Sequence, residues 1–507
     1  MNKMTKFSKF LTLPIAISLI ITTFALASCS ANVQNPPSEP TTASNAPQNG
    51  EKPAPDKPSD FPAPPNGDQP LIPKDIFDDS NMMLPADKNE PSSYAAVNTY
   101  DANDVIKDLE VSSTGIDESA VLVDKGAEVT INNFKIDRAN ATSTGGDAAS
   151  FYGVGAAALT TNGILNLNVG EINTDSKGGA GVFAYGLGVA NVNNVSIKTK
   201  QDTSGGIHVA GGGTLNAANV TAETNGESSA AIRSDRGGGK MVVDAGTFTT
   251  NGSGSPAIYC TAEIEVNDAK LFANNNEGIC IEGLNTTTLR DCELTCNMPD
   301  QTQNDCTWSV IVYQSMSGDS QVGKGTFNME RGILTSKNGG IFYTTNTESD
   351  FNIRNITINA ANDSEFLLKA TGNNNERGWG KKGENGAKCT FNASEQELIG
   401  KIIYDSISTL DINLLEGTTY TGQIIRDDSA SNDANTNGHA NLTIDENSHW
   451  IVAGDSELKT LTIKDSSNFL ARISDSNNDE VKIIDAEGKV LHDGTSPYTI
   501  TVGELIM

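Results

Sequence analysis

The sequence predicts an all-β protein, a right-handed parallel β-helix (solenoid) of roughly 13 coils, preceded by a disordered Pro-rich tether. One short strand returns seven times between residues 180 and 345, at steps of 25, 25, 26, 21, 32 and 30 residues. Pairs of short alternating strands, separated by Gly, Asn or Asp, follow several of these returns, as in KMVVDAGTFTT after Gly239. A period that drifts in this way is typical of stacked coils with loops of unequal length.

The returns predict which side chains face the interior of the stack. Their second positions are Val182, Ile207, Ile232, Ile258, Ile279, Ile311 and Ile341. Because a single coil cannot bury its apolar side, we expect inward residues such as Ile207, Val243 and Phe248 to stack on their equivalents one coil away, about 4.8 Å along the axis. Coils of this length and irregularity favour the right-handed form over tight left-handed hexapeptide coils.

Two runs carry a resemblance to known families. The segments 254–259 (GSPAIY) and 277–283 (EGICIEG) resemble right-handed β-helices of the pectin-lyase-like superfamily, as found in bacterial surface proteins. The segment 448–456 (SHWIVAGDS) is similar to the last coils of autotransporter passenger domains. The chain departs from that second family by ending at Met507, so the resemblance does not imply self-export. Together the resemblances cover most of residues 105–475 and imply a fold rather than a function.

Residues 1–28 are expected to be a lipoprotein signal peptide. A start with three lysines precedes an apolar stretch over residues 10–26, and the sequence LASC at residues 26–29 resembles a bacterial lipobox. That resemblance implies that Cys29 is lipidated and becomes the mature amino terminus, which makes the protein an exported, membrane-anchored lipoprotein at the cell surface. An ordinary signal peptide with a chance cysteine and an uncleaved membrane helix are the alternatives, although a spanning helix needs about 20 apolar residues.

The rest of the chain divides by composition. Residues 29–100 are expected to form the Pro-rich linker, because 14 of the 18 prolines fall between residues 29 and 91 and the segment has no apolar pattern to bury. Val, Ile, Thr, Asn and Gly then dominate the β-helix, expected over residues 101–480, with inserted loops at 138–152 and 372–388. Residues 481–507 are expected to form a C-terminal cap, a small hairpin that closes the open sheet edge.

The charge balance excludes one class of partner. A formal charge of −29 makes nucleic acid a poor ligand, because phosphate contacts require clustered Lys and Arg. The same acidity permits Ca²⁺ in turns, such as the loop with Asp427, Asp428 and Asp433, but the spacing is not that of an EF-hand. Solvated acidic loops are the simpler interpretation, and no metal site or other cofactor is predicted.

The chain has seven cysteines, and six remain when the expected lipidation site, Cys29, is set aside. Cys260 falls at an inward position and is expected to be a core residue. Cys292, Cys296 and Cys306 cluster around a loop, so a disulfide between Cys296 and Cys306 can form if the compartment is oxidising. A zinc site is the weaker alternative, because no histidine lies nearby and no CxxC pair is present.

No catalytic residues are predicted. Glycosidases of the pectin-lyase-like superfamily carry Asn-Thr-Asp, Asp-Asp and Gly-His-Gly signatures, and partial matches stand at 173–175, 427–428 and 438–439. They lie several coils apart, and the usual basic signature after the histidine is missing. The lyases of that superfamily need a basic residue beside carboxylates, and only Arg233 with Asp235 and Arg236 comes near such a cluster.

A row of outward residues offers a binding surface instead. The expected row is Phe183, His208, Arg233, Tyr259, Cys280, Val312 and Phe342. Aromatic faces beside planar polar groups suit sugar rings, which stack on the ring and hydrogen-bond at the edge. The ligand-binding candidates are Tyr185, His208, Arg233, Asp235, Tyr259 and Glu282, with Trp308 and Trp379 nearby in loops. The alternatives are that exposed strands simply favour such residues, or that a loop covers the face.

These features predict a cell-surface-anchored β-helical lipoprotein that acts as an adhesin or glycan-binding protein, without catalysis. Its expected partners are a polysaccharide or a ligand on a host or neighbouring cell, and the membrane through the lipid anchor. The alternatives are a polysaccharide lyase or glycoside hydrolase of the pectin-lyase-like fold, and a passive structural surface component. An acidic cleft would favour the enzyme, an uncovered aromatic row the binding protein, and a loop-covered row the passive component.

Overall fold

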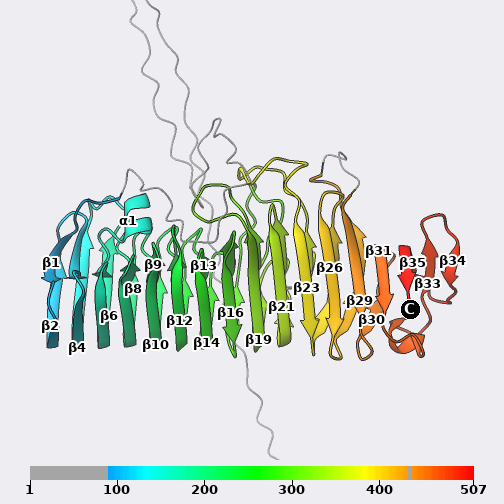
Figure 1. Ribbon diagram of the computed structural model, residues 1–507, viewed down its shortest axis with the longest axis horizontal. Coiled ribbons are helices and arrows are strands. Elements are labelled where there is room, and N and C mark those ends of the chain that lie inside the picture. Colours follow the sequence, from blue (N-terminus) through cyan, green and yellow to red (C-terminus); the bar gives the residue numbers. More distant parts are fainter. Residues whose placement is uncertain (1–89, 432–436) are drawn as a thin grey trace, which may run out of the picture. The chain divides into compact units, whose positions relative to one another are not determined.

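The computed structural model describes residues 90–431 and 437–507. The signal peptide over residues 1–28, the lipidation site Cys29 and the linker up to residue 89 lie outside the described residues. Those described form an all-β fold of 35 strands with one α-helix and one 3-10 helix, whose long parallel sheets are compatible with a β-helix-like solenoid. Successive coils are stacked in chain order (Figure 1).

One sheet consists of a single short strand from each coil, and we call it the short-strand sheet. All its neighbouring strands pair in parallel. Its order is β1 (Ala95–Tyr100), β3 (Glu118–Val123), β5 (Ala158–Thr160), β7 (Val182–Tyr185), β9 (Ile207–Ala210), β11 (Ile232–Ser234), β13 (Ile258–Cys260), β15 (Ile279–Glu282), β18 (Val310–Tyr313), β20 (Phe342–Thr345), β22 (Leu368–Ala370), β25 (Ile402–Tyr404) and β28 (Ile424–Arg426). The first strand lies inside the expected linker, because the alternating segment AAVNTY pairs with β3.

The second sheet, here the long-strand sheet, takes the remaining strands of each coil. Its parallel part runs through β2 (Asp104–Ser113), β4 (Ala127–Asn140), β6 (Gly163–Ser176), β8 (Val189–Thr199), β10 (Gly213–Thr224), β12 (Gly239–Thr250), β14 (Glu263–Ala273), β16 (Thr286–Arg290) with β17 (Glu293–Cys296), β19 (Lys324–Ser336), β21 (Glu348–Asn359), β23 (Lys388–Ser394), β26 (Thr409–Leu415), β29 (His439–Ile444) and β31 (Ser456–Ile463). A small third sheet accompanies the last coils, in the order β24 (Glu397–Ile399), β27 (Thr419–Gly422), β30 (His449–Val452) and β32 (Ile473–Asp475).

The C-terminal segment closes the long-strand sheet. β33 (Lys482–Asp485) and β34 (Val490–His492) form an antiparallel hairpin. The last strand, β35 (Thr499–Ile506), lies between β31 and β33 and pairs with both in parallel. A short 3-10 helix, η1 (Phe469–Ala471), precedes β32. The edge of β31 is therefore paired by the chain's own last strand.

Along the long-strand sheet, from β2 to the end of β26, the chain bends at one residue per coil in the left-handed backbone conformation. The paired registers place these residues in one row: Asp108, Asn133, Val169, Asn194, Asn219, Ala245, Asp268, Asp291, Arg331, Asn355, Glu395 and Glu416. Asn and Asp occur often because they adopt positive φ more readily than other side-chain-bearing residues. Val169, with φ 56° and a β-branched side chain, is the strained member of the row.

Inward residues from the sheets form one continuous core. The residues expected to be inward, including Ile207, Val243 and Phe248, are fully buried. Phe327, Phe342, Phe351 and Phe391 add an aromatic cluster, with the rings of Phe342 and Phe351 5.4 Å apart. Each such burial contributes about 1.5–3 kcal/mol, which allows the stack to persist without disulfides.

The expected alignment was wrong for two coils. Ile279 pairs with Val310 and not with Ile311, and Val310 pairs with Phe342. A shift of one residue exchanges the two faces of a strand. Val312 and Phe342, expected to point outward, therefore lie in the core, and Ile311 and Tyr343 take their outward places.

Long connections rise from one side of the stack (Figure 1). The segment 138–152, expected to be a loop, contains the helix α1 (Gly146–Tyr152). The helix ends at Gly153, whose left-handed conformation allows its N–H to bond back to the carbonyl of Ala149. Residues 149–152 are buried, so this insertion is a packed element.

Candidate functional site

The outward residues of the short-strand sheet form one row, which we call the covered strip. Its members pair in register across consecutive strands: Phe183, His208, Arg233, Tyr259, Cys280, Ile311 and Tyr343. Their exposed fractions are all 9% or lower. Five of the seven residues expected in this row belong to it, and other segments cover the row.

The helix α1 covers the part of the strip nearest the amino terminus. Arg233 donates from Nη2 to the Ser150 hydroxyl at 3.0 Å. The guanidinium of Arg236 lies 4.2 Å from the centre of the Phe151 ring. The ring of Tyr152 lies edge-on to Tyr185, with centres 5.5 Å apart. Insertion of α1 therefore converts an outer sheet face into an interior layer.

Three of the six binding candidates form one charged group under this helix. Asp235 Oδ2 accepts from Arg233 Nε at 2.7 Å and lies 3.2 Å from His208 Nε2. Burial, and then the charge of Arg233, lowers the pKa of His208 to about 4, although Asp235 acts in the opposite direction. The imidazole, which also packs on Phe183 at 4.1 Å, is therefore neutral at physiological pH.

Two further candidates meet in the middle of the strip. The hydroxyls of Tyr259 and Tyr313 donate to Glu282 Oε2 at 2.9 and 3.1 Å, and the Ser315 hydroxyl donates to the other carboxylate oxygen. Burial raises the pKa of Glu282, although these donors lower it. Arg236 pairs with Asp319 at 2.7 Å, which holds the 314–323 loop above the group.

Tyr185, the sixth candidate, lies apart from both groups. Its hydroxyl is 3.4 Å from Glu90 Oε1, and its ring lies edge-on to Tyr152 and packs against the buried cluster that contains Phe183. Burial, followed by the charge of Glu90, raises the pKa of Tyr185 to about 12. The structure thus distributes the six candidates over three places along the strip.

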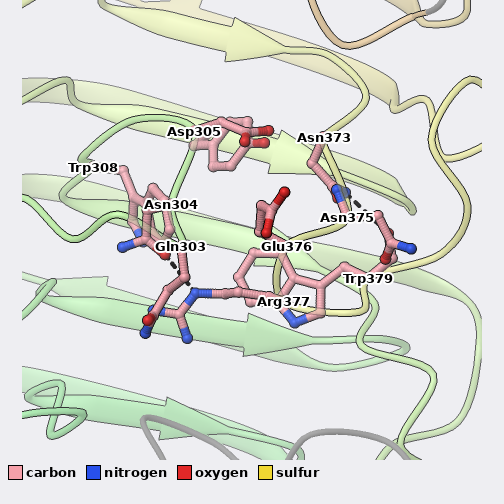
Figure 2. Close-up of a pocket in the computed structure, with 10 residues that line it drawn as sticks. Gln303, Asn304, Asp305, Trp308, Asn373, Asn375, Glu376, Arg377 and Trp379 are labelled. Carbon is pink, nitrogen blue, oxygen red and sulfur yellow. Dashed lines mark hydrogen bonds between the residues drawn. The ribbon is translucent and has the colours of Figure 1, made fainter. Parts of the chain in front are cut away.

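A small hollow lies at the far end of the strip, where the loops 297–309 and 371–387 meet. Figure 2 shows Trp308 and Asn304 from one loop facing Arg377 and Trp379 from the other. The Trp308 ring lies 5.2 Å from Tyr343, and Trp379 lies 4.4 Å from Tyr313. Arg377 lies over Trp379 at 5.4 Å. Both tryptophans, expected in exposed loops, are buried.

Polar groups line the same hollow. Arg377 Nε donates to Asn304 Oδ1, and the backbone N–H of Asn374 donates to Asp305 Oδ2 at 2.7 Å, so the two loops are joined. Among the described residues that line the hollow, three have a buried polar atom without a hydrogen-bond partner: Trp308 Nε1, Asn304 Nδ2 and the Tyr343 hydroxyl. The hollow has a volume of about 10 Å³, which is room for one water molecule.

Sequence reasoning missed Tyr313, Ser315 and Asp319. Tyr313 escaped notice because the one-residue slip assigned it to the wrong position of its strand. Ser315 and Asp319 belong to a loop without any periodic pattern. The partial glycosidase signatures stay apart, since 173–175 belong to β6 and His439 begins β29, far along the long-strand sheet.

The disulfide considered between Cys296 and Cys306 is not formed, because both thiols are free. Cys296 points into the main core from β17, whereas Cys306 lies among the residues around the hollow. They therefore lie on different sides of the coil wall. In residues 90–431 and 437–507, no group of three or more His, Cys, Asp and Glu side chains is placed to hold a metal ion.

The helices within the described ranges are too short or too polar to cross a membrane. Comparison of the chain with known proteins gave no match to a family model, to a curated protein or to a solved structure.

Proposed function

We propose that this chain is a cell-surface-anchored lipoprotein that binds glycans as an adhesin, without catalysis. In this proposal Cys29 carries the lipid, the Pro-rich segment is the tether, and the solenoid is a right-handed β-helix of the pectin-lyase-like type. The composition and the resemblances described above support the anchor and the fold type. The side chains around the hollow support the binding role.

The observation that carries the proposal is the group of unpartnered polar atoms around the hollow, on Trp308, Asn304 and Tyr343. A buried donor without an acceptor costs about 1–3 kcal/mol, so Trp308 Nε1 and Asn304 Nδ2 favour a ligand that supplies acceptor oxygens. A sugar hydroxyl has the size of the water that the hollow can hold, and it can replace that water without loss of hydrogen bonds. The sugar ring would then lie outside, against the more exposed Asn375, Glu376 and Arg377.

The covered strip has a different role in this proposal. Since its side chains are buried and mutually bonded, they fix the loops that form the hollow and do not themselves contact a glycan. A fully covered face was also what we expected of a passive surface component. The unpartnered donors are what distinguish a binding protein from that alternative.

Removal of one N–H group tests the proposal. Trp308→Phe keeps an aromatic ring and deletes the Nε1 donor, which has no partner in the protein. On a glycan array probed with the full-length chain, we expect the strongest hits to weaken about tenfold, the equivalent of one hydrogen bond. Trp450→Phe is the matched control, because its Nε1 donates to the Gly422 carbonyl at 3.1 Å inside the core.

The two variants should show opposite patterns. Trp308→Phe should reduce binding with little effect on the melting temperature, and Trp450→Phe should lower the melting temperature with little effect on binding. An array without hits, or hits that Trp308→Phe leaves unchanged, would contradict a glycan site in the hollow.

A second candidate function, a polysaccharide lyase or glycoside hydrolase, has one observation in its favour. Glu282 is a buried carboxyl with a raised pKa beside two tyrosines and Ser315, which is the kind of group that acts as a general acid. Product analysis of every array hit distinguishes the two functions. Shortened or unsaturated products that disappear in Glu282→Gln would support the enzyme.

A further inference from the structure

A second surface lies on the outer face of the long-strand sheet. Four asparagines of consecutive coils and one threonine form a hydrogen-bonded row, which we call the amide ladder: Thr288, Asn328, Asn352, Asn392 and Asn413. Each asparagine donates from Nδ2 to the residue of the preceding coil, at distances of 2.7 to 3.0 Å. An amide has two N–H groups and two acceptor lone pairs. Each asparagine within the ladder therefore keeps one N–H group and one lone pair for a ligand.

A groove of about 290 Å³ runs along this ladder. Its other wall carries Arg290, Glu330, Arg354 and Ser394, which pair in register one coil after another. The side chains of Arg290, Glu330 and Arg354 are 38% to 43% exposed, and each already forms an ion pair with a neighbouring side chain, Arg290 with Glu265 and Arg354 with Glu395 and Glu416. The groove is much larger than the hollow and lies on the other sheet.

We propose that this groove binds an extended, neutral polysaccharide whose sugar rings follow one another along the stack of coils. The amides repeat at about the 4.8 Å interval of parallel strands, an interval similar to the rise of one ring in a straight sugar polymer. A sugar hydroxyl both donates and accepts hydrogen bonds, as does the outer side of each asparagine amide in the ladder. The opposite wall adds the partly exposed guanidinium groups of Arg290 and Arg354 and the carboxylate of Glu330, which offer further donors and acceptors to sugar hydroxyls.

The charge and the straightness of the row narrow the ligand further. A chain with a formal charge of −29 repels polyanions, so uronic acid polymers are disfavoured. A straight row of donors and acceptors matches a ribbon of β-1,4-linked rings, whereas an α-1,4-linked chain coils away from a straight row. The ligand class is therefore a neutral β-1,4-linked glycan.

The chain contains its own control for a purely structural ladder. Asn166, Asn191 and Asn216 form an equivalent row near the amino-terminal end of the same sheet, with hydrogen bonds of 2.7 and 2.9 Å. These residues do not line the groove. Asn191→Ala and Asn352→Ala therefore remove equivalent hydrogen bonds between neighbouring coils, but only Asn352→Ala changes the groove.

Isothermal titration calorimetry of the full-length chain tests the proposal with hexamers of β-1,4-linked glucose, mannose and N-acetylglucosamine. An α-1,4-linked glucose hexamer and a galacturonate hexamer are the comparators. We expect at least one β-1,4-linked hexamer to bind more tightly than both comparators, and Asn352→Ala to weaken that binding about tenfold. Asn191→Ala should leave it within about twofold.

A second variant separates loss of binding from loss of folding, in case Asn352→Ala disturbs the sheet itself. Ser394→Trp fills the groove without removing a ladder hydrogen bond and should also abolish binding. Trp308→Phe should have no effect, which separates the groove from the hollow. The proposal is overturned if none of the three β-1,4-linked hexamers binds, if a comparator binds more tightly, or if Asn191→Ala weakens binding as much as Asn352→Ala.

Discussion

The two outer faces of the solenoid differ although both are built from parallel strands with alternating side chains. On the short-strand sheet, insertions cover the outward row, and His208 and Tyr343 are 1% exposed. On the long-strand sheet the outward row of asparagines remains at the surface. The comparison shows that alternation determines which residues leave the core, whereas the connections between strands determine whether they reach solvent.

The same difference predicts how strongly each face depends on its polar contacts. A buried charge that loses its partner keeps the full cost of desolvation, whereas an exposed charge regains water. Substitutions in the covered strip should therefore cost more stability than substitutions of partly exposed pairs on the long-strand sheet.

The largest effect is expected for Asp235→Ala. Arg233 and His208 would lose their shared carboxylate within the covered strip, and we expect a loss of about 3–5 kcal/mol in the free energy of unfolding. The control is Glu265→Ala on the long-strand sheet, which removes the partner of Arg290 at 2.7 Å. Because that pair is partly exposed, the expected loss is below about 1 kcal/mol. Equal losses in denaturant titrations would show that the strip is not buried in solution.

The next effect is a pH dependence at His208. The folded pKa is lowered to about 4, while the unfolded value is about 6.5. Below pH 6.5 the unfolded chain therefore gains a proton that the folded chain does not, and up to about 3 kcal/mol of stability is lost as the pH falls toward 4.

His208→Gln isolates this contribution. Glu282 has a raised pKa and contributes in the opposite sense, with stability that is present at low pH and lost as the pH rises through its folded value. Both proteins retain Glu282, so the difference between their unfolding curves at pH 7 and pH 4 belongs to His208. The variant should lose less stability over that interval, and identical losses would argue against a neutral buried imidazole.

The smallest effect concerns the bend of the long strands. Val169 has φ 56°, a conformation that costs a residue other than Gly, Asn or Asp about 1–2 kcal/mol. Val169→Asn should raise the free energy of unfolding by about 1 kcal/mol, and the reciprocal Asn194→Val in the next coil should lower it similarly. Changes of the same sign in thermal melts would mean that backbone strain does not govern this row.

The interior could be predicted because it repeats. Inward residues such as Ile207 and Phe248 recur at fixed places in coil after coil, and each coil supports the assignment of its neighbours. The register failed where the loops before β18 and β20 lengthened, because Val310-Ile311-Val312 and Ile341-Phe342-Tyr343 offer apolar residues on both faces. Hydrophobic alternation cannot choose a face in such a run.

The site could be predicted only in part. Tyr259 and Glu282 were identified by their place in the repeat, and they are bonded to each other. Their covering was not predictable, since α1 and the loops 297–309 and 371–387 carry no periodicity that would show where they fold back. Long-range contacts between non-repeating segments, such as Asn374 with Asp305, have no local signal in the sequence.

The buried free thiols can report where the stack of coils opens locally. The described part of the chain has six, all buried: Cys260 on β13, Cys280, Cys292 and Cys296 in the coil of β15 to β17, Cys306 in the loop before β18, and Cys389 on β23. Burial raises the pKa of each thiol, so an alkylating reagent can react only when that coil opens. The order in which the thiols become labelled would reveal whether the coil of β15 to β17 opens before or after the coils that hold Cys260 and Cys389.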